Sequence, residues 1–267
     1  MGRILDWTHE GIDTSGVWWW RVALLLLAAT LVVGSATAAA PRPPLSRLTR
    51  APRAPAAAST LACPTGPTRC KTYAAFLTWT GNDVRQFWAK EFTTGGIHWR
   101  PAGQVSVPRG STAHTRCNGG LLVTAHKGPF YCAVDGAAGK IFLPLLGIQA
   151  LIFPGYPSYV PHAFAVSYVV AHEWAHHVQQ LLGLLHGRHS IRIELQADCL
   201  AGVWGHTAWS RNLVSNADID RTLRLANLIG DVAGTPAGAG THGTGQQRVS
   251  AFLAGYNSGS PDACADR

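Results

Sequence analysis

The sequence predicts an α+β protein that is mostly helical, with a small flanking β-sheet and one apolar segment ahead of the folded part. Apolar residues recur at helical spacing, without Pro or Gly, across 163–182. Short stretches with strand composition occur at 103–107, 120–125 and 139–143. The residues at 22–40 form an uncharged apolar run. Long helices, few and short strands, and one N-terminal apolar run together favour this fold class.

The chain of 267 residues has room for one domain of about 200 residues and an N-terminal extension. We divide it into a leader at 1–21, the apolar segment at 22–40, a linker at 41–60 and a folded domain at 61–267. The linker is rich in Pro, Ala and Arg and has no periodicity.

The apolar segment at 22–40 is close in length to one bilayer crossing, and Trp18 to Arg21 would anchor one end at the interface. The alternative is a secretory signal cleaved after small residues near Ala38 or Ala40. Acidic residues in the leader are unusual for a signal, whereas the Arg residues after the run argue against an N-inside anchor. We expect a single-pass anchor in the cell membrane with the folded domain outside the cytoplasm, and keep secretion as the alternative.

The net charge is +8, and several Arg of the linker contribute to it. The folded part has no Lys/Arg-rich run interleaved with aromatic residues, so we expect no nucleic-acid partner. Attraction to an anionic envelope surface fits the charge better.

The chain has six Cys, and an even number in an exported chain indicates disulfides. Proximity along the chain favours Cys63–Cys70 and Cys117–Cys132. A zinc site made of Cys is not expected, because no Cys-x-x-Cys pair exists.

Helix ends follow from capping patterns. Thr80 is the expected cap of a helix that runs to Phe92, and a short apolar helix is expected at 144–152. Residues 153–161, with three Pro, are expected to form a loop that walls a cleft. A turn is expected at Gly183 to His189, and Ser190 is the expected cap of a helix at 190–210. A Ser-x-x-Asp box at Ser215 is expected to start a helix that runs to about 229, and a Thr-x-x-Gln box at Thr244 is expected to start a last helix that ends near 255–257. A Gly-rich loop at 232–243 separates the two.

The predicted helix at 163–182 contains His172-Glu173-Trp174-Ala175-His176, a His-Glu-x-x-His motif. Residues four apart lie on one face of a helix, so both imidazoles can reach one metal ion. Glu173 is placed beside them to hold a water molecule and accept its proton. The pattern predicts a site for one Zn²⁺ and a hydrolytic reaction.

Glu194 is the expected third ligand, because a turn between two antiparallel helices would return it to the side of His176. Two His, one Glu and an open fourth position are typical of catalytic rather than structural zinc. Asp198 lies one turn beyond Glu194, where it could bind the outer ring nitrogen of a His ligand. A cap, or a pair with Arg192, is the alternative for Asp198.

These blocks, with several others, resemble the putative neutral zinc metallopeptidase family of bacterial envelope proteins. The resemblance covers roughly residues 75–264, and its blocks are Ala171 to Gln179, Glu194 to Cys199 and on to Trp204, Ile229 to Asp231, Thr241 to Gly243 with Gln247 and Arg248, and Phe130 to Cys132 with Asp135. The chain departs from the family pattern at Ala175, where Gly is usual, and at Val232, where a second Asp is common.

The resemblance implies a zincin-like core, an N-terminal membrane segment, and protein or peptide substrates. It implies His172, His176 and Glu194 as ligands and Glu173 as general base. It also favours a Cys199–Cys264 disulfide, through the family-like tail. In zincin-like folds a sheet edge can take an extended peptide by strand addition, and we expect the same here.

The other His residues and one Arg have more than one interpretation. His242 and Arg248 could stabilise the oxyanion of a tetrahedral intermediate, or serve as a cap or an ion-pair partner. Helical spacing excludes His177 from the ligand set, and His186 and His189 are expected to be surface residues of the turn. Trp174 and Trp204 are expected in the core.

Three functions are compatible with these residues. The first is a membrane-tethered, extracytoplasmic zinc peptidase. The second is an envelope binding or scaffolding module that retains a zinc site but cleaves little, against which the intact Glu173 argues. The third is zinc-assisted hydrolysis of something other than a peptide.

Overall fold

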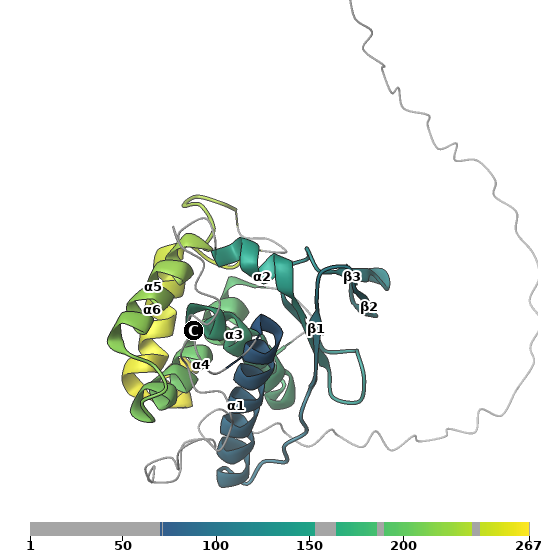
Figure 1. Ribbon diagram of the computed structural model, residues 1–267. Helices are drawn as coiled ribbons and strands as arrows, with labels where there is room; N and C mark the ends of the chain where they lie inside the picture. Colours follow the sequence, from purple (N-terminus) through teal and green to yellow (C-terminus); the bar gives the residue numbers. More distant parts are fainter. Residues whose placement is uncertain (1–69, 71, 153–163, 186–189, 237–240, 267) are drawn as a thin grey trace, which may run out of the picture. The chain divides into compact units, whose positions relative to one another are not determined.

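The computed structural model describes Cys70 and residues 72–152, 164–185, 190–236 and 241–266 (Figure 1). The predictions for the leader, the apolar segment, the linker, the loop at 153–161, Cys63, His186 and His189 lie outside the described residues. Within the described ranges, no helix combines the length and apolar character that a bilayer crossing requires.

The described chain is an α+β protein dominated by helices, as predicted. The helices are α1 (Tyr73–Thr94), α2 (Leu145–Ile152), α3 (Phe164–Leu182), α4 (Ile191–Ser210), α5 (Asn216–Leu228) and α6 (Gly245–Ser258). The strands are β1 (Gly103–Val107), β2 (Thr112–His114), β3 (Leu122–Thr124), β4 (Phe130–Cys132) and β5 (Lys140–Pro144). Short 3₁₀ turns lie at Cys117–Gly119 and Pro261–Cys264.

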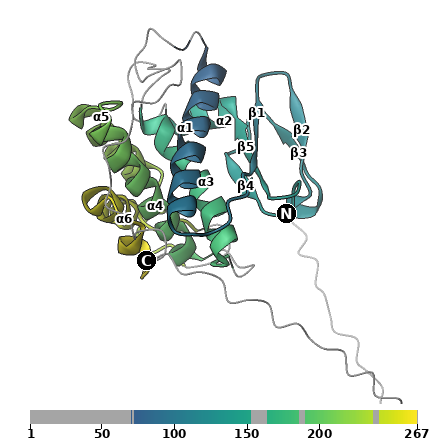
Figure 2. The same cartoon turned by 90° about the horizontal axis from the view of Figure 1, so that it is seen from below.

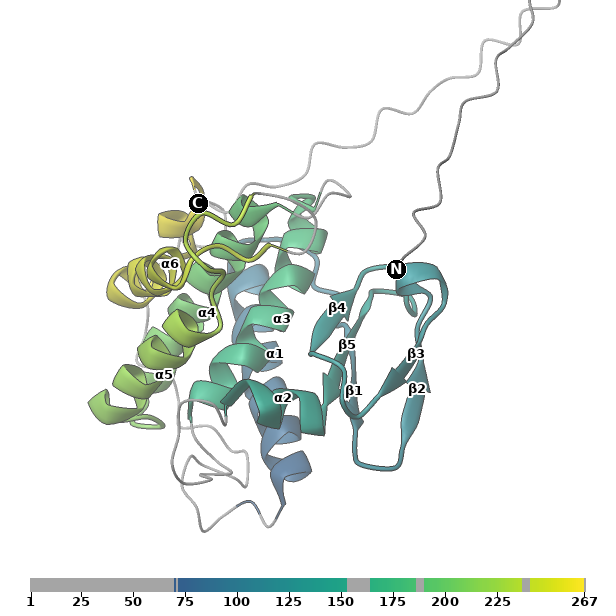
Figure 3. The same ribbon diagram turned by 90° about the horizontal axis from the view of Figure 1, so that it is seen from above.

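Helix α3 is the centre of the fold, because almost all of its side chains, polar as well as apolar, are buried. Helices α1, α4 and α5 pack against it, and α6 packs on α4 and α5. Figures 2 and 3, which show the molecule from below and from above, both place the strands on one side of α3, and α5 and α6 on the other side. Every polar side chain that α3 presents inward therefore needs a partner from a neighbouring element.

A three-stranded sheet with the order β1-β5-β4 lies beside α3. Strand β5 pairs in parallel with β1 and antiparallel with β4, with Phe130 opposite Phe142 and Cys132 opposite Lys140. The β2 and β3 strands form a separate antiparallel pair. Strand β4 is therefore an edge strand of its sheet.

The strand predictions were correct in position but incomplete. The stretch at 103–107 coincides with β1, and the other two predicted strands overlap β3 and β5. Strands β2 and β4 were not predicted. Three residues are too few to show a period of two, and of the three-residue strands only β3 was predicted, from its composition.

The predicted start of the first helix was wrong. Helix α1 begins at Tyr73, and the side chain of Thr72 accepts a hydrogen bond from the Ala75 amide. Thr80, the predicted cap, lies within the helix, where its hydroxyl is buried and lies 3.2 Å from the Ser167 hydroxyl. The helix extends further because Phe76 and Leu77 pack into the core.

The remaining capping predictions are confirmed. Ser190 caps α4, and Ser215 and Thr244 each form a reciprocal capping box at the start of α5 and α6. Gly183 follows α3 with a φ of +73°, a left-handed conformation that favours glycine.

Helices α4 and α6 approach so closely that glycine is required at their contact. A Cβ atom added to Gly202 would lie 2.1 Å from the Phe252 carbonyl oxygen, and one added to Gly255 would lie 1.9 Å from the Cys199 carbonyl oxygen. The predicted disulfide Cys199–Cys264 closes the same region, and the predicted Cys117–Cys132 joins a 3₁₀ turn to β4. The tail after α6 is therefore fixed to α4 by a covalent bond.

A buried ion pair joins α1 to α4. The guanidinium of Arg211 donates to both carboxylate oxygens of Asp83, at 2.7 and 2.6 Å, and the Trp204 indole donates to the same carboxylate at 2.9 Å. The pair is remote in sequence from the His-Glu-x-x-His motif and belongs to the core.

Candidate metal centre

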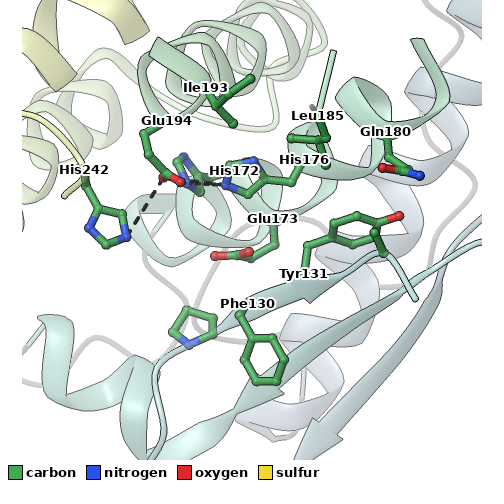
Figure 4. Close-up of a pocket in the computed structure, with 12 residues that line it drawn as sticks. Phe130, Tyr131, His172, Glu173, His176, Gln180, Leu185, Ile193, Glu194 and His242 are labelled. Atoms are coloured by element: carbon green, nitrogen blue, oxygen red, sulfur yellow. Dashed lines mark hydrogen bonds and ion pairs between the residues drawn. The ribbon is translucent and has the colours of Figure 1, made fainter. Parts of the chain in front are cut away.

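Three ligand atoms converge where α3 and α4 face each other (Figure 4). Nε2 of His172 lies 3.1 Å from Nε2 of His176 and 3.1 Å from Oε2 of Glu194, and Nε2 of His176 lies 3.6 Å from the same oxygen. Ligands about 2.05 Å from a tetrahedral ion are about 3.3 Å apart. The cluster therefore has the dimensions of a tetrahedral metal site with three protein ligands. Glu194 thus lies beside His176, as the sequence predicted.

A charged network lies behind His172. Nδ1 of His172 lies 2.8 Å from Oδ1 of Asp198, as expected for a carboxylate that orients a metal-binding imidazole. Arg248 donates to both oxygens of Asp198, from Nε at 2.9 Å and from Nη2 at 3.0 Å. The Tyr168 hydroxyl donates to Asp198 at 2.5 Å and accepts from Arg248 at 3.0 Å. All four side chains are buried, so the imidazole is fixed in orientation.

The charges of this network explain its pKa values. Burial opposes ionisation of Asp198, but Arg248 and His172 outweigh it and lower the pKa of Asp198 to about 2. Burial likewise opposes the charged form of His172, but Asp198 and Glu194 outweigh it and raise its pKa to about 10. The same negative charges of Asp198 and Glu194 that hold a proton on His172 would also attract a metal cation to the three ligand atoms.

A neutral network lies behind His176. Nδ1 of His176 lies 2.8 Å from Oε1 of Gln179, whose amide nitrogen donates to the Ile193 carbonyl at 2.8 Å and to Oε1 of Gln196 at 3.0 Å. Gln196 in turn donates to the Cys264 carbonyl at 3.0 Å. Both histidines therefore have an acceptor at Nδ1, which leaves each Nε2 directed at the metal position.

A cavity of about 250 Å³ opens beside the three ligand atoms. Glu173 lines it and is buried, and burial raises the pKa of its carboxyl above the usual range. Across the cavity from the ligands lies β4, and Figure 4 shows Phe130 and Tyr131 of that strand on the side of Glu173. The other residues that line the cavity are Pro129, Ala133, Gln180, Leu185, Ile193 and His242.

The structure separates the two candidates for transition-state stabilisation. His242 lines the cavity, with Nε2 4.0 Å from Oε2 of Glu194, and its side chain is about half exposed. Asp231 fixes its loop by accepting from the amides of His242 and Gly243 at 2.7 and 2.8 Å. Arg248 does not line the cavity; it lies behind His172 and binds Asp198. Only His242 can contact a molecule in the cavity directly.

Sequence reasoning missed most of the residues around the ligands. The spacing of Gln179, three residues after His176, was a usable signal, because it places both on one face of α3. Tyr131 appeared only as part of a family block, and Tyr168 only as part of an apolar pattern. Neither residue had a local signal for its contact, because the partners are far away in sequence.

The comparisons with known proteins agree with this geometry. The family described as putative neutral zinc metallopeptidase matches residues 24–266. The chain belongs to this family. No solved structure matches the chain significantly.

Two relatives show how far the similarity of the chain to known proteins extends. The uncharacterized protein YpfJ of Escherichia coli K12 is 34% identical over 207 residues, which cover 66% of this chain and 65% of the relative. The uncharacterized protein Rv2575 of Mycobacterium tuberculosis H37Rv is 33% identical over 222 residues, which cover 69% of this chain and 72% of the relative. The matched region is thus just under two thirds of the Escherichia coli relative's length.

Proposed function

We propose that the protein is a zinc-dependent peptidase with a zincin-like core. The observation that carries the proposal is the meeting of three ligand atoms and the Glu173 carboxyl at one cavity. Imidazole and carboxylate are ligands that zinc accepts, and three of them leave a coordination position open, as catalytic zinc sites do. Family membership supports a hydrolase of this class.

The proposed chemistry divides between the ion and the side chains. When bound, zinc supplies a Lewis acid that polarises a scissile carbonyl and lowers the pKa of water. Glu173 accepts a proton from the attacking water and passes it to the leaving amine. Burial raises the pKa of Glu173 above that of a free glutamate, which makes its carboxylate a stronger base.

His242 and Arg248 have different proposed roles. The His242 imidazole lies beside the ligands at the open side of the cavity, where it can donate a hydrogen bond to the oxyanion that forms during attack. Arg248 acts through Asp198, by holding the carboxylate that orients His172.

The proposed substrate is an extended segment of a protein or peptide. Strand β4 pairs with β5 on one side only within the described sheet, and its residues line the cavity beside Glu173. An extended chain could pair with the other edge of β4 and so present a carbonyl to the site.

We further propose that the domain works outside the cytoplasm, tethered through 22–40 or released after cleavage of a signal. The disulfides Cys117–Cys132 and Cys199–Cys264, which lie within the described residues, support this location, because such bonds persist in oxidising compartments.

The test compares the full chain with its Glu173→Gln variant, for zinc content and for cleavage of a broad peptide library. We expect one zinc ion in both proteins and cleavage by the wild type alone. Zinc in both proteins with no cleavage by either would favour an envelope binding or scaffolding module, and a folded wild type without zinc would refute the proposal.

A further inference from the structure

One buried histidine next to the candidate ligands has no part in the proposed chemistry. His177 follows His176, but its side chain points to the sheet side of α3 and is fully buried. Nε2 donates to the Arg100 carbonyl at 2.7 Å, and the ring packs edge-on against Trp99 and Trp174. With Nε2 occupied as a donor, Nδ1 of the neutral ring is available as an acceptor.

The partner of that acceptor is Tyr131 in β4. The Tyr131 hydroxyl lies 3.1 Å from Nδ1 of His177 and 3.3 Å from the Ala138 carbonyl oxygen. The same hydroxyl fills the space over Gly139, where an added Cβ atom would lie 2.1 Å from it. Gly139 has a φ of +89°, so the turn before β5 is shaped to admit this side chain.

The contact matters because β4 is short and lies at the edge of its sheet. Two of its three residues are held from outside α3: Phe130 stacks on Phe142 of β5, with 4.8 Å between ring centroids, and Cys132 is bonded to Cys117. Of these three residues, Tyr131 is the one that hydrogen-bonds to α3, the helix that contributes His172, Glu173 and His176. The Tyr131–His177 contact therefore links the edge strand to the catalytic helix.

We propose that His177 is a positioning residue for substrate binding. Through Tyr131 it holds β4 at the separation from α3 at which an extended peptide can pair with the strand and reach the metal site. The proposal deepens the peptidase function and rests on it. It assigns the residue after His176 to binding of the peptide chain rather than to the metal or to proton transfer.

The test uses two zinc-binding hydroxamates, one without and one with a peptide chain. Acetohydroxamate contacts the metal site alone, whereas a hydroxamate with a short N-acetylated peptide also contacts the strand. Dissociation constants are measured by calorimetry on the zinc-loaded full chain, for the wild type, His177→Phe and Tyr131→Phe. His206→Phe is the matched control, because Nδ1 of His206 also donates to a carbonyl oxygen, that of Tyr256 at 2.7 Å, between α4 and α6.

We expect both variants to bind zinc and acetohydroxamate as the wild type does, and to bind the peptidyl hydroxamate about tenfold more weakly, because a strand that is no longer held must be ordered on binding. His206→Phe should change neither constant. Tyr131→Phe keeps the ring in place and removes only the hydroxyl, so it remains informative if the His177 variant does not fold.

Equal weakening of both hydroxamates would overturn the proposal, because His177 would then act on the metal site. Unchanged binding of the peptidyl hydroxamate by both variants would also overturn it, while leaving the peptidase proposal intact. A wild-type protein that binds zinc but prefers neither hydroxamate would refute peptide binding at β4, and the positioning role with it.

Discussion

The two candidate histidine ligands both direct Nε2 at the metal position, but different side chains hold their Nδ1 atoms. Nδ1 of His172 is bound by the Asp198 carboxylate, which is itself held by Arg248 and Tyr168. Nδ1 of His176 is bound by the Gln179 amide, which leads to Gln196 and the Cys264 carbonyl. One side of the site depends on buried charges, and the other on neutral amides.

The difference shows that an imidazole can be held in the same orientation either by a charged carboxylate or by a neutral amide. A buried carboxylate orients an imidazole and also adds negative charge near a metal cation, but it requires a buried cation to offset its own desolvation. An amide orients without charge, and its loss leaves only unsatisfied hydrogen-bonding groups. We therefore expect the two sides to respond differently to substitution.

The largest effect is expected from Asp198→Asn. This change removes the negative charge that offsets Arg248 and supports His172, so the zinc-free protein should lose about 3 to 5 kcal/mol of unfolding free energy. Zinc affinity should fall about 10- to 100-fold. Urea denaturation without zinc, and zinc titration against a competing chelator, measure the two quantities. Wild-type zinc affinity in this variant would show that the charged network does not act on the metal site.

Asp83→Asn provides a comparison with an ion pair of similar chemistry outside the site. The change leaves Arg211 without its carboxylate, and we expect a loss of about 3 kcal/mol of unfolding free energy. Zinc affinity should stay within about twofold of the wild type, because the pair has no contact with the ligands. The same two titrations apply. If Asp83→Asn lowered zinc affinity as much as Asp198→Asn, the effect of both would be general loosening of the fold.

Gln179→Leu tests the neutral side. Leucine fills a similar volume but leaves groups of His176, Ile193 and Gln196 without their hydrogen-bond partner, so we expect a loss of about 1 to 3 kcal/mol of stability. Zinc affinity should fall about tenfold, less than for Asp198→Asn. Stability and affinity are measured as above, and an effect on affinity larger than that of Asp198→Asn would contradict the ranking of the two networks.

His177 extends the comparison to a third buried histidine of α3. Burial lowers its pKa to about 4. The unfolded chain, with a pKa near 6.5, binds this proton more readily, so the stability that neutral His177 contributes is present above pH 6.5 and is lost as the pH falls toward 4. Between pH 7 and pH 5 the wild type should therefore lose about 2 kcal/mol more than His177→Phe. Urea denaturation of both zinc-free proteins at the two pH values checks this, and parallel losses would show that His177 is not buried in the neutral form.

Local patterns were sufficient for the parts of the site that lie on one helix. The spacing of His172, Glu173 and His176 predicts their common location, because four residues make about one helical turn. Ser190, as a cap, determines where α4 begins, and a short turn between antiparallel helices was enough to predict the return of Glu194 to His176. The edge strand β4, which lines the cavity, was not predicted, since a strand of three residues is too short to show a period of two.

By itself, the sequence determined the chemistry: which side chains could bind a metal, which carboxyl stands beside them, and which helix carries them. The tertiary structure decided how those side chains are held. Arg248 could be an oxyanion donor by sequence alone, and its place behind Asp198 follows from the packing of α6 on α4. The contact of Tyr131 with His177 likewise depends on where the sheet meets α3. Helical spacing is a property of neighbouring residues, whereas these contacts join segments that only the packed core brings together.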